Sequence, residues 1–418
     1  MSLRKLLFAA TILGAECSFA QPVPIDQAVK EATEKNVNLI AERMNIPIAE
    51  ARIITAKLRP NPVLSLGADY LDVLGTGFTK ENQAGPSEGN ARVDFLFERG
   101  KKREYRTEVA QLNRSVAELN VLNTMRGIML DVENAYLDVL AATESVALAN
   151  ENLKALGEIV SVNTERVRTG DLARVELLRS RLAALQYRNQ ARQAELRLRS
   201  AQHKLKQLMG RPATSPDIDV TGPMRRDPEA KPLEAILDTA GKLRPDLNAL
   251  VRDQARSAAD IRLQIAQGKV DYTAGAQVHR QQSVNGTGSS LGLFLSMPLP
   301  VFNRNQGEIE RARLEHEQLS LRIKALQTSI GTEVQTAYEQ YRTSRAMLES
   351  IEKEMLQQAR DVRSTTEYSY RRGEASLLEF LDAQRAFNDT IQSYNDARAD
   401  YARSLYQLDS VSGEAVNR

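Results

Sequence analysis

Two acidic side chains that could act on a cation lie three residues apart near the C-terminal end of the chain. Glu379 and Asp382 follow Gly373 in the stretch YRRGEASLLEFLDAQR, residues 370–385. Residues three apart in a helix share one face, so the pair would present two carboxylates on the same side. Carboxylates repeated around a symmetry axis attract cations and repel anions. The alternative is an ordinary solvated helix face.

Residues that could hold a metal ion or carry out catalysis are not grouped in the sequence. The three histidines, His203, His279 and His316, are far apart, and the nine methionines form no close cluster. The sequence has no P-loop and no H-E-x-x-H motif. We therefore expect no enzyme activity, no cofactor and no metal site.

Charge along the chain gives no sign of a nucleic-acid partner. The formal net charge is +2, with no basic tail and no acidic block. Basic residues are frequent between Arg179 and Lys206. We interpret them as spread round a helix whose surface is solvated, with partners in the same helix such as Glu195 for Arg199. They include Arg188, Arg192, Arg197, Arg199 and Lys204.

The first twenty residues have the pattern of a secretory signal peptide. Arg4 and Lys5 precede an apolar run at 6–15, and Ser-Phe-Ala at 18–20 supplies a small-x-small cleavage signal. We therefore predict that residues 1–20 are removed and that the protein is exported.

Export limits how the mature chain could enter a membrane. No other stretch approaches the roughly 18 apolar residues of a spanning helix, so a membrane would have to be entered by strands. Cys17 is the only cysteine, and the charge of Glu16 before it fits a lipid-anchor signal poorly. We do not expect lipidation.

The rest of the chain is an internal duplication. The two halves are 21–210 and 233–413, separated by a linker with five prolines at 211–232 and followed by a tail at 414–418. The stretch VRTGDLARVELLRSR at 167–181 corresponds to the acidic stretch at 370–385, so the glycine and the residues after it occur twice.

Each half contains two segments with the alternating pattern of an amphipathic strand. They lie at 63–73, 91–98, 270–280 and 289–299, and Gly-, Ser- and Asn-rich loops at 74–90 and 281–289 join each pair. About ten residues is the length that a tilted strand needs to cross a bilayer. Two ordinary surface hairpins are the alternative.

Long proline-free segments with apolar residues at spacings of three and four follow the strands. They run from Lys101 to about Arg168 and from Gly307 to Arg372, and the segments at 174–209 and 376–410 return. The pattern predicts coiled-coil hairpins, about 100 Å long at 1.5 Å per residue. Such hairpins form a rod or the wall of a tube. Four strands cannot close a barrel, so two or three chains must pool eight or twelve.

This order of elements resembles the TolC-like outer-membrane efflux protein family over essentially the whole mature chain. LRPNP at 58–62 and FERGKKR at 97–103 are similar to its heavy-metal-cation branch, which acts with resistance-nodulation-division (RND) pumps. The resemblance implies a homotrimer with a twelve-stranded β-barrel in the outer membrane and a long α-helical barrel in the periplasm. It implies a periplasmic adaptor protein, an inner-membrane pump and outer-membrane lipid as further partners.

The resemblance also implies where the two glycine stretches lie in the folded protein. Gly170 and Gly373 would turn the two helical hairpins at the periplasmic end, where the family meets its adaptor. The matching residues are Val167, Arg168, Gly170, Asp171 and Ala173 in the first half, and Arg371, Gly373, Glu374, Ser376 and Leu377 in the second.

A gate at this end is implied by the same resemblance, held by an inner-helix tyrosine and acidic rings. The matching residues are Tyr370, Glu379 and Asp382, with Glu176 and Arg179 from the first half. An arginine that the family has two residues after the second glycine is replaced by Ala375, so the same ion pair cannot form. Arg371, Arg372 and Arg179 are the possible substitutes.

The expected function is therefore that of an outer-membrane exit duct for heavy-metal cations, which conducts passively and is driven by the pump. One alternative keeps the duct and changes its cargo to drugs or to the substrates of type I secretion. A second alternative is a periplasmic coiled-coil scaffold with no pore.

Overall fold

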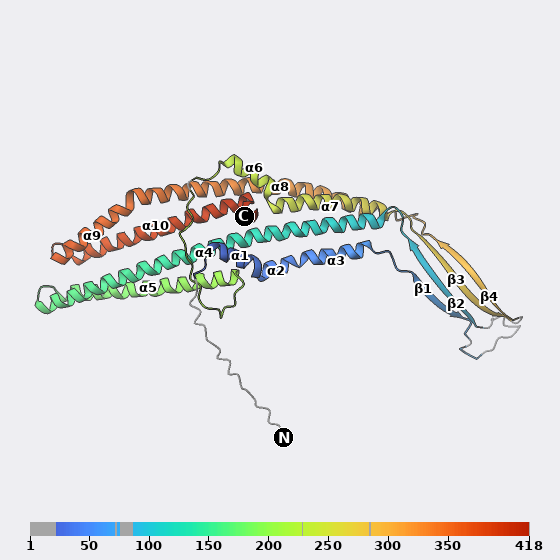
Figure 1. Ribbon diagram of the computed structural model, residues 1–418, viewed down its shortest axis with the longest axis horizontal. Coiled ribbons are helices and arrows are strands. Elements are labelled where there is room, and N and C mark those ends of the chain that lie inside the picture. The colour runs from blue at the N-terminus through green and yellow to red at the C-terminus, as the bar shows by residue number, and fades with distance from the viewer. Residues whose placement is uncertain (1–21, 72, 76–86, 228, 284–285, 418) are drawn as a thin grey trace, which may run out of the picture. The chain divides into compact units, whose positions relative to one another are not determined.

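The computed structural model of the chain describes residues 22–71, 73–75, 87–227, 229–283 and 286–417 (Figure 1). The predicted signal peptide, Cys17 and most of the predicted loop at 74–90 lie outside the described residues. Within the described part, no helix is both long enough and apolar enough to cross a membrane.

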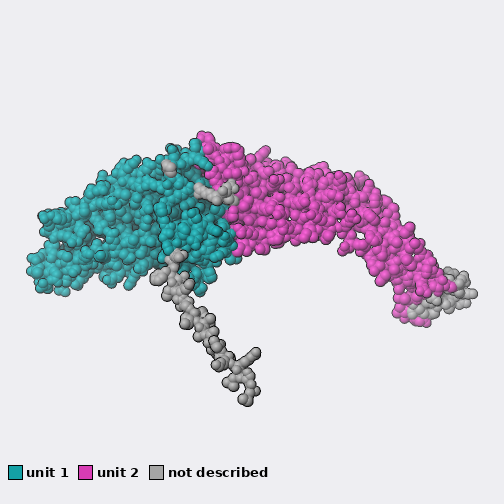
Figure 2. Space-filling model, in the orientation of Figure 1, with its two compact units in different colours: residues 1–37, 126–232, 336–410 teal, residues 38–125, 233–335, 411–418 magenta. Residues whose placement is uncertain are grey.

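The chain divides into two compact units (Figure 2). Unit 1 consists of Met1–Val37, Arg126–Pro232 and Thr336–Ser410, and unit 2 consists of Asn38–Met125, Leu233–Gln335 and Val411–Arg418. Each unit therefore contains segments from both sequence halves, so the compact units do not coincide with the halves at 21–210 and 233–413.

Helices make up most of both units. The elements that lie in unit 1 or pass through it are α1 (Ile25–Lys35), α4 (Lys102–Thr169), α5 (Arg174–Leu208), α8 (Gln306–Ser350), the π-helical turn η1 (Ile351–Met355), α9 (Leu356–Arg372) and α10 (Leu377–Ser412). The remaining helices are α2 (Val37–Arg43), α3 (Asn45–Lys57), α6 (Leu233–Leu243), α7 (Pro245–Gln267) and the 3₁₀ turn η2 (Glu414–Asn417), which occupies most of the predicted tail.

Unit 2 contains one antiparallel sheet in the order β1-β2-β3-β4. The strands are β1 (Val63–Asp69), β2 (Glu88–Phe97), β3 (Tyr272–Ser283) and β4 (Gly286–Ser296). The register places Leu64, Val93, Ala276 and Leu293 in one row across the sheet. Because side chains alternate along a strand, this row and its neighbours two residues away form one apolar face.

The predicted strand ends at 73, 91, 270, 280, 289 and 299 differ from the observed ones. β1 stops at Asp69 because Tyr70 has a φ of +54°, which leaves the extended region. β4 stops at Ser296 because prolines at 298 and 300 have no N–H for the ladder. β3 and β4 instead continue through much of the predicted loop at 281–289, since backbone pairing does not require apolar side chains.

The FERGKKR motif forms the corner between β2 and α4. Lys102 is 4% exposed, and its Nζ atom lies 2.7 Å from Oδ2 of Asp271 and donates to the carbonyl of Lys269. The backbone N–H of Arg99 donates to the other oxygen of Asp271. Gly100 has a φ of +76°, where a non-glycine residue would be strained. The motif therefore fastens the strand to the helix.

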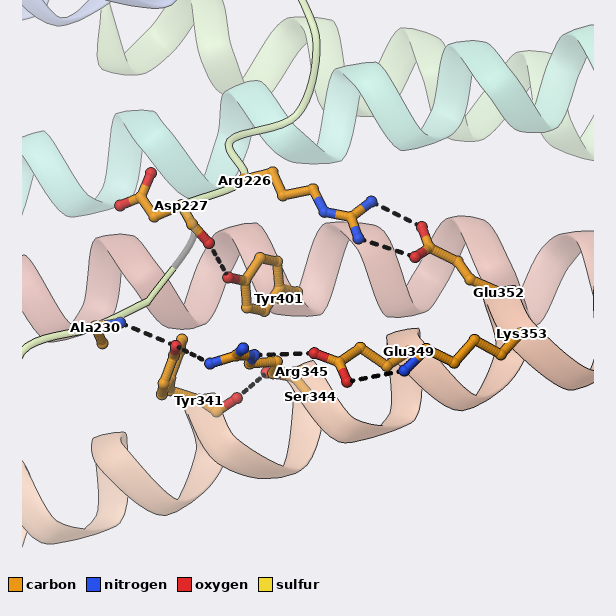
Figure 3. A network of polar contacts seen from close by, with 10 residues as sticks. All are labelled: Arg226, Asp227, Ala230, Tyr341, Ser344, Arg345, Glu349, Glu352, Lys353 and Tyr401. Carbon is orange, nitrogen blue, oxygen red and sulfur yellow. Dashed lines mark hydrogen bonds and ion pairs between the residues drawn. The ribbon is translucent and has the colours of Figure 1, made fainter.

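The long helical segment of the second half is interrupted where the linker passes over it (Figure 3). A π-helical turn, Ile351–Met355, separates α8 from α9, whereas α4 is continuous over 68 residues. Arg226 of the linker donates two hydrogen bonds of 2.9 Å to Glu352 in this turn. The hydroxyl of Tyr401 donates to the carbonyl of Asp227, 2.7 Å away. The linker is thus attached to the turn and to α10.

Candidate entrance gate at the hairpin ends

Two helical hairpins end in unit 1 with the same backbone geometry. We call α4–α5 hairpin 1 and α9–α10 hairpin 2. Gly170 has a φ of +87° and Gly373 a φ of +83°, so both lie in the left-handed region that glycine adopts without strain. After each glycine, the next N–H donates to the carbonyl five residues back, Arg166 or Ser369. The two sequence copies therefore fold into the same helix-ending turn.

The hairpins pack against each other through a small apolar cluster near these turns. Its buried residues are Leu156, Ile159, Ala183, Tyr370, Leu377 and Phe380. Tyr370 is 3% exposed and stacks on Phe380 with a centroid distance of 5.4 Å. Its hydroxyl donates to Oδ1 of Asn163, 2.8 Å away on hairpin 1. Tyr370 therefore joins the two hairpins.

The side chain of Tyr370 is buried between the two hairpins. Burial raises the pKa of its phenol above the usual value. Asn163 is fully buried, and its Nδ2 atom has no hydrogen-bond partner among the residues that the structure describes. An unsatisfied buried amide weakens this contact between the hairpins.

Further from the turns, polar bonds and ion pairs continue between the hairpins. Gln384 donates to Asn152, 2.8 Å away, and Asn388 donates to the hydroxyl of Tyr187, 3.0 Å away. Three glutamates of α4 spaced seven residues apart meet arginines of hairpin 2: Glu144 with Arg398, Glu151 with Arg363, and Glu158 with Arg371. The interface is thus held by polar contacts along much of its length.

Glu379 is part of a capping box at the start of α10. Its Oε2 atom accepts hydrogen bonds from the backbone N–H of Ser376 at 2.7 Å and from the Ser376 hydroxyl at 2.9 Å. The backbone N–H of Ser376 and then its hydroxyl lower the pKa of Glu379. The carboxylate is therefore ionised and fixed in direction.

The other predicted gate residues pair within their own helices. Asp382 is exposed and lies 3.5 Å from Arg385, and Glu176 lies 2.9 Å from Arg179. Arg179 thus has a partner in its own helix and makes no ion pair with Glu379 or Asp382 in the described structure.

The remaining possible substitutes for the family arginine also have other contacts. Arg371 pairs with Glu367 on its own helix and with Glu158, and Arg372 stacks over Tyr368. Among the described ion pairs, none of the three substitutes contacts Glu379 or Asp382.

The residues predicted to meet an adaptor surround the two glycines. At the first turn, Thr169 donates to the carboxylate of Asp171, 2.6 Å away, and Ala173 is the N-terminal flanking residue of α5. Val167 and Arg168 lie in the last turn of α4, and Arg371 lies in the last turn of α9. At the second turn Glu374 is exposed, Ser376 caps α10 and Leu377 belongs to the buried cluster.

Sequence reasoning missed Asn163 and Phe380, the two side chains that hold Tyr370. The signal for Asn163 was its spacing, because Leu156, Ile159 and Asn163 follow the three-and-four pattern of a buried seam. The capping role of Glu379 was also visible, since Ser376 precedes it by three residues at the start of an apolar run.

Comparison with known proteins identifies the class to which this architecture belongs. A model of the outer membrane efflux protein family matches residues 28–211 and 236–414, which together are most of the chain. The protein belongs to the outer membrane efflux protein family. This confirms the predicted family and the predicted outer-membrane location. The family consists of channels, so the prediction that the chain is not an enzyme is confirmed as well.

Individual relatives are distant but span nearly the whole chain. The cobalt-zinc-cadmium resistance protein CzcC of Cupriavidus metallidurans is 23% identical over 366 residues, covering 88% of this chain and 84% of its own. The pyoverdine export outer membrane protein OpmQ of Pseudomonas putida is also 23% identical, over 407 residues, covering 88% of this chain and 81% of its own.

A solved structure confirms the predicted fold class. The CusC structure, from a study of folding and transmembrane channel formation, superposes with a TM-score of 0.76 at 17% identity. The match covers 94% of this chain and 93% of CusC. Channels of this family are homotrimers that work with an adaptor and an inner-membrane pump.

Proposed function

We propose that this protein is the exit duct of a tripartite efflux system and conducts heavy-metal cations passively across the outer membrane. In this proposal three copies pool their strands into a twelve-stranded barrel, and their helical hairpins form a tube in the periplasm. A periplasmic adaptor contacts the turns at Gly170 and Gly373, and an inner-membrane RND-type pump supplies the energy.

The apolar face of the sheet is the observation that carries the channel proposal. Leu64, Leu291, Leu293 and Leu295 lie on this face and are between 62% and 81% exposed. The opposite face is polar, with an ion pair of 2.9 Å between Arg92 and Asp94. A sheet with one lipid-facing side, one polar side and two open edges is completed by neighbouring strands around a lumen.

The gate would lie where hairpins 1 and 2 meet. Tyr370 fastens the two hairpins to each other, and the exposed carboxylates of Glu379 and Asp382 lie one turn apart just beyond. Repeated by three-fold symmetry, these six carboxylates would attract cations to the entrance. Glu176 and Arg179 would form a neutral pair beside them.

Cargo is the part of the proposal that rests on the relatives. CzcC is named for cobalt, zinc and cadmium resistance, which favours metal cations. OpmQ is named for pyoverdine export, which favours a small organic product and keeps the second cargo class in view. A duct conducts what its pump delivers, so the pump decides between these cargoes.

Two measurements test the proposal together. Purified protein added to planar bilayers is expected to give stepwise conductance from detergent-extracted trimers. A strain that lacks the gene and has no redundant homologue is expected to lose tolerance to cobalt, zinc, cadmium or copper, and the intact gene is expected to restore it.

The outcomes separate the three hypotheses. A protein that is extracted without detergent and gives no conductance steps is a scaffold, and the channel proposal fails. A conducting protein whose deletion leaves metal tolerance unchanged but lowers resistance to drugs or export of a small organic product is a duct for another cargo.

A further inference from the structure

Five exposed basic side chains gather where the strands of unit 2 meet its helices (Figure 1). They lie in the short segments between α3 and β1, β2 and α4, α7 and β3, and β4 and α8, so each strand contributes at least one. We call them the basic rim: Arg59, Arg99, Lys101, Lys269 and Arg304. A surface with this concentration of positive charge attracts anions.

Close contacts bring these segments into one surface. A Cβ atom on Gly100 would lie 2.6 Å from Cδ of Lys269, so the lysine stem packs against the segment between β2 and α4. A Cβ atom on Gly268 would lie 2.6 Å from the carbonyl oxygen of Arg304, so the segments before β3 and after β4 also touch.

Among the described residues, the acids beside the basic rim are paired with bases outside it. Glu98 is bound by Arg106, which also donates to the carbonyl of Leu58, 3.4 Å away and next to Arg59. None of the five rim side chains makes an ion pair in the part of the chain that the structure describes. The other acids near the rim pair in the same way: Asp271 with Lys102, Glu104 with Arg103, Glu308 with Arg311, and Glu310 with Arg313.

The basic rim borders the last row of the apolar face of the sheet. Phe97 and Tyr272 form that row across β2 and β3, four residues beyond the row of Val93 and Ala276. The guanidinium of Arg99 lies over the Tyr272 ring, with Cζ 4.9 Å from the ring centroid. Aromatic side chains with one apolar and one polar end are enriched where hydrocarbon meets water. The rim therefore marks one boundary of the apolar face.

The segment between β4 and α8 adds an apolar projection to this boundary. Leu299, Val301 and Phe302 are 78%, 63% and 90% exposed. Arg304 follows them, and its Nε atom donates to the carbonyl of Pro300, 3.2 Å away, which holds the guanidinium on the same turn. Exposed apolar groups beside unpaired cations match the chemistry of a phospholipid, in which acyl chains adjoin a phosphate.

We propose that the basic rim binds the headgroups of anionic phospholipids in the periplasmic leaflet of the outer membrane, with Phe302 and its apolar neighbours among the acyl chains. The long helices leave the sheet at this end, so this end faces the periplasm in the proposed channel. Guanidinium and ammonium groups donate hydrogen bonds to phosphate oxygens, and a basic cluster is attracted to an anionic membrane. The proposal rests on the proposed channel and adds the class of lipid that it binds.

A neighbouring copy does not supply the missing negative charge. In the proposed barrel, β4 of one copy adjoins β1 of the next, because these two strands are the open edges of the sheet. Their helical ends then bring Arg304 of one copy towards Arg59 of the next. Both are basic, so closing the barrel increases the need for an anion at this boundary.

The opposite end of the sheet is different. The described residues there carry charges of both signs: Arg280 is exposed, Asp69 and Glu88 are acidic, and Glu88 lies 3.0 Å from His279. The concentration of unpaired bases therefore belongs to the end of the sheet that meets the helices, and we expect one leaflet to be recognised rather than both.

Lipid binding to assembled trimers tests the proposal. Full-length protein in neutral detergent is titrated with phosphatidylglycerol or phosphatidylethanolamine, with or without inorganic phosphate, and bound lipids are counted by native mass spectrometry. We expect a preference for phosphatidylglycerol that weakens with added salt. Each base near an anionic membrane contributes about fivefold in affinity, so Lys269→Gln with Arg304→Gln is expected to weaken binding about 25-fold.

Matched variants separate charge at the rim from general effects on charge or folding. Arg322→Gln with Lys324→Gln removes the same two charges from exposed positions on α8 and is expected to leave the preference unchanged. Lys269→Arg with Arg304→Lys keeps both rim charges and is expected to retain binding. If the rim double variant does not assemble, Arg99→Gln replaces it, with Arg99→Lys as the charged control.

The outcomes distinguish this proposal from the proposed function. Conducting trimers that bind both lipids equally, or that lose binding equally in the α8 control, would overturn the proposal and leave the channel standing. Displacement of phosphatidylglycerol by an equal concentration of inorganic phosphate would make the rim a site for free anions and would also overturn it. Absence of any trimer would contradict the proposed function, and this proposal with it.

Membrane depth gives a second test that does not depend on charge. The sequence has no tryptophan, so Phe302→Trp introduces a single fluorescent reporter. In vesicles of phosphatidylethanolamine and phosphatidylglycerol, its fluorescence is expected to be quenched by lipids brominated close to the headgroup. Leu321→Trp is the control and is expected to stay unquenched, because Leu321 is 61% exposed on α8, about 22 Å beyond the start of that helix. An unquenched Phe302→Trp channel would overturn the proposal.

Discussion

Tyr370 shows how one side chain joins two distant parts of the sequence. Its ring lies in the apolar cluster and its hydroxyl reaches Asn163, 207 residues earlier in the chain. The contact is specific but weak, because the second polar atom of Asn163 has no partner in the described structure. A contact of this kind can close an entrance and still open at modest cost.

Tyr370→Phe tests this contact at the level of one oxygen atom. The variant keeps the stacking on Phe380 but leaves Asn163 without its hydrogen bond, at a cost of about 1–3 kcal/mol. We expect a several-fold higher conductance of the idle channel in planar bilayers. Tyr368→Phe is the control, because that tyrosine is 55% exposed. Equal conductance of the two variants would remove Tyr370 from the gate.

Glu379 combines a structural and a proposed electrostatic task, which two substitutions separate. Glu379→Gln retains an acceptor for the capping box, whereas Glu379→Ala removes it. With Asp382→Asn, we expect Glu379→Gln to reduce block by multivalent cations added from the periplasmic side while helix stability is kept. An unchanged block would exclude both carboxylates from the gate.

The pH dependence of this block follows from the direction of the pKa shift. The pKa of Glu379 is lowered from 4.5 by the N–H of Ser376, so the folded state favours the ionised form. In the folded channel, Glu379 therefore keeps its negative charge as the pH falls and loses it only when the pH passes through the lowered folded-state pKa. We therefore expect the Glu379 part of the block to be constant from pH 8 to about pH 5.

At the scale of elements, the two halves differ in one long helix. α4 is continuous, whereas α8 and α9 are separated by the π turn at 351–355, to which the linker residue Arg226 is attached (Figure 3). Single π turns inside α-helices are often functional sites, because the extra residue disturbs the regular hydrogen bonding. The linker contact is therefore placed where the regular α-helical hydrogen bonding of this segment is interrupted.

Arg226→Ala is expected to loosen the π turn without unfolding the protein. The pair is partly exposed, so its loss costs no more than about 1 kcal/mol. Faster hydrogen exchange is expected in residues 351–355 and in the linker. Arg342→Ala breaks an exposed pair with Glu339 on α8 and serves as the control. If exchange in 351–355 rises equally in both variants, the linker does not hold the turn.

At the scale of the whole molecule, the sequence was sufficient for the features that depend on periodicity. The long helices, the glycine turns and the existence of four strands follow from spacing, proline positions and alternation. The π turn could not be predicted, because its residues IEKEM are ordinary helix formers. The two compact units were missed as well, since they bring together segments from both halves.

Side-chain direction decides which contacts of the proposed gate residues could be anticipated. The sequence placed Glu379 and Asp382 on one face, but the partners of their side chains depend on the turn that begins α10. Tyr370 was chosen from resemblance, and its partner Asn163 lies on another hairpin, where only packing brings them together. Contacts within one helix were therefore more predictable than contacts between helices.

The corner formed by FERGKKR affects how a resistance screen of variants would be interpreted. The nearly buried Lys102 at the start of α4 pairs with the partly exposed Asp271, which directly precedes β3. Losing one partner of such a pair destabilises a fold strongly. Loss of resistance from either residue would therefore reflect a shortage of assembled channels, whereas gate variants would alter the flux through each one. Quantifying the protein in outer-membrane fractions sorts sensitive strains into these two groups before any cargo is assayed.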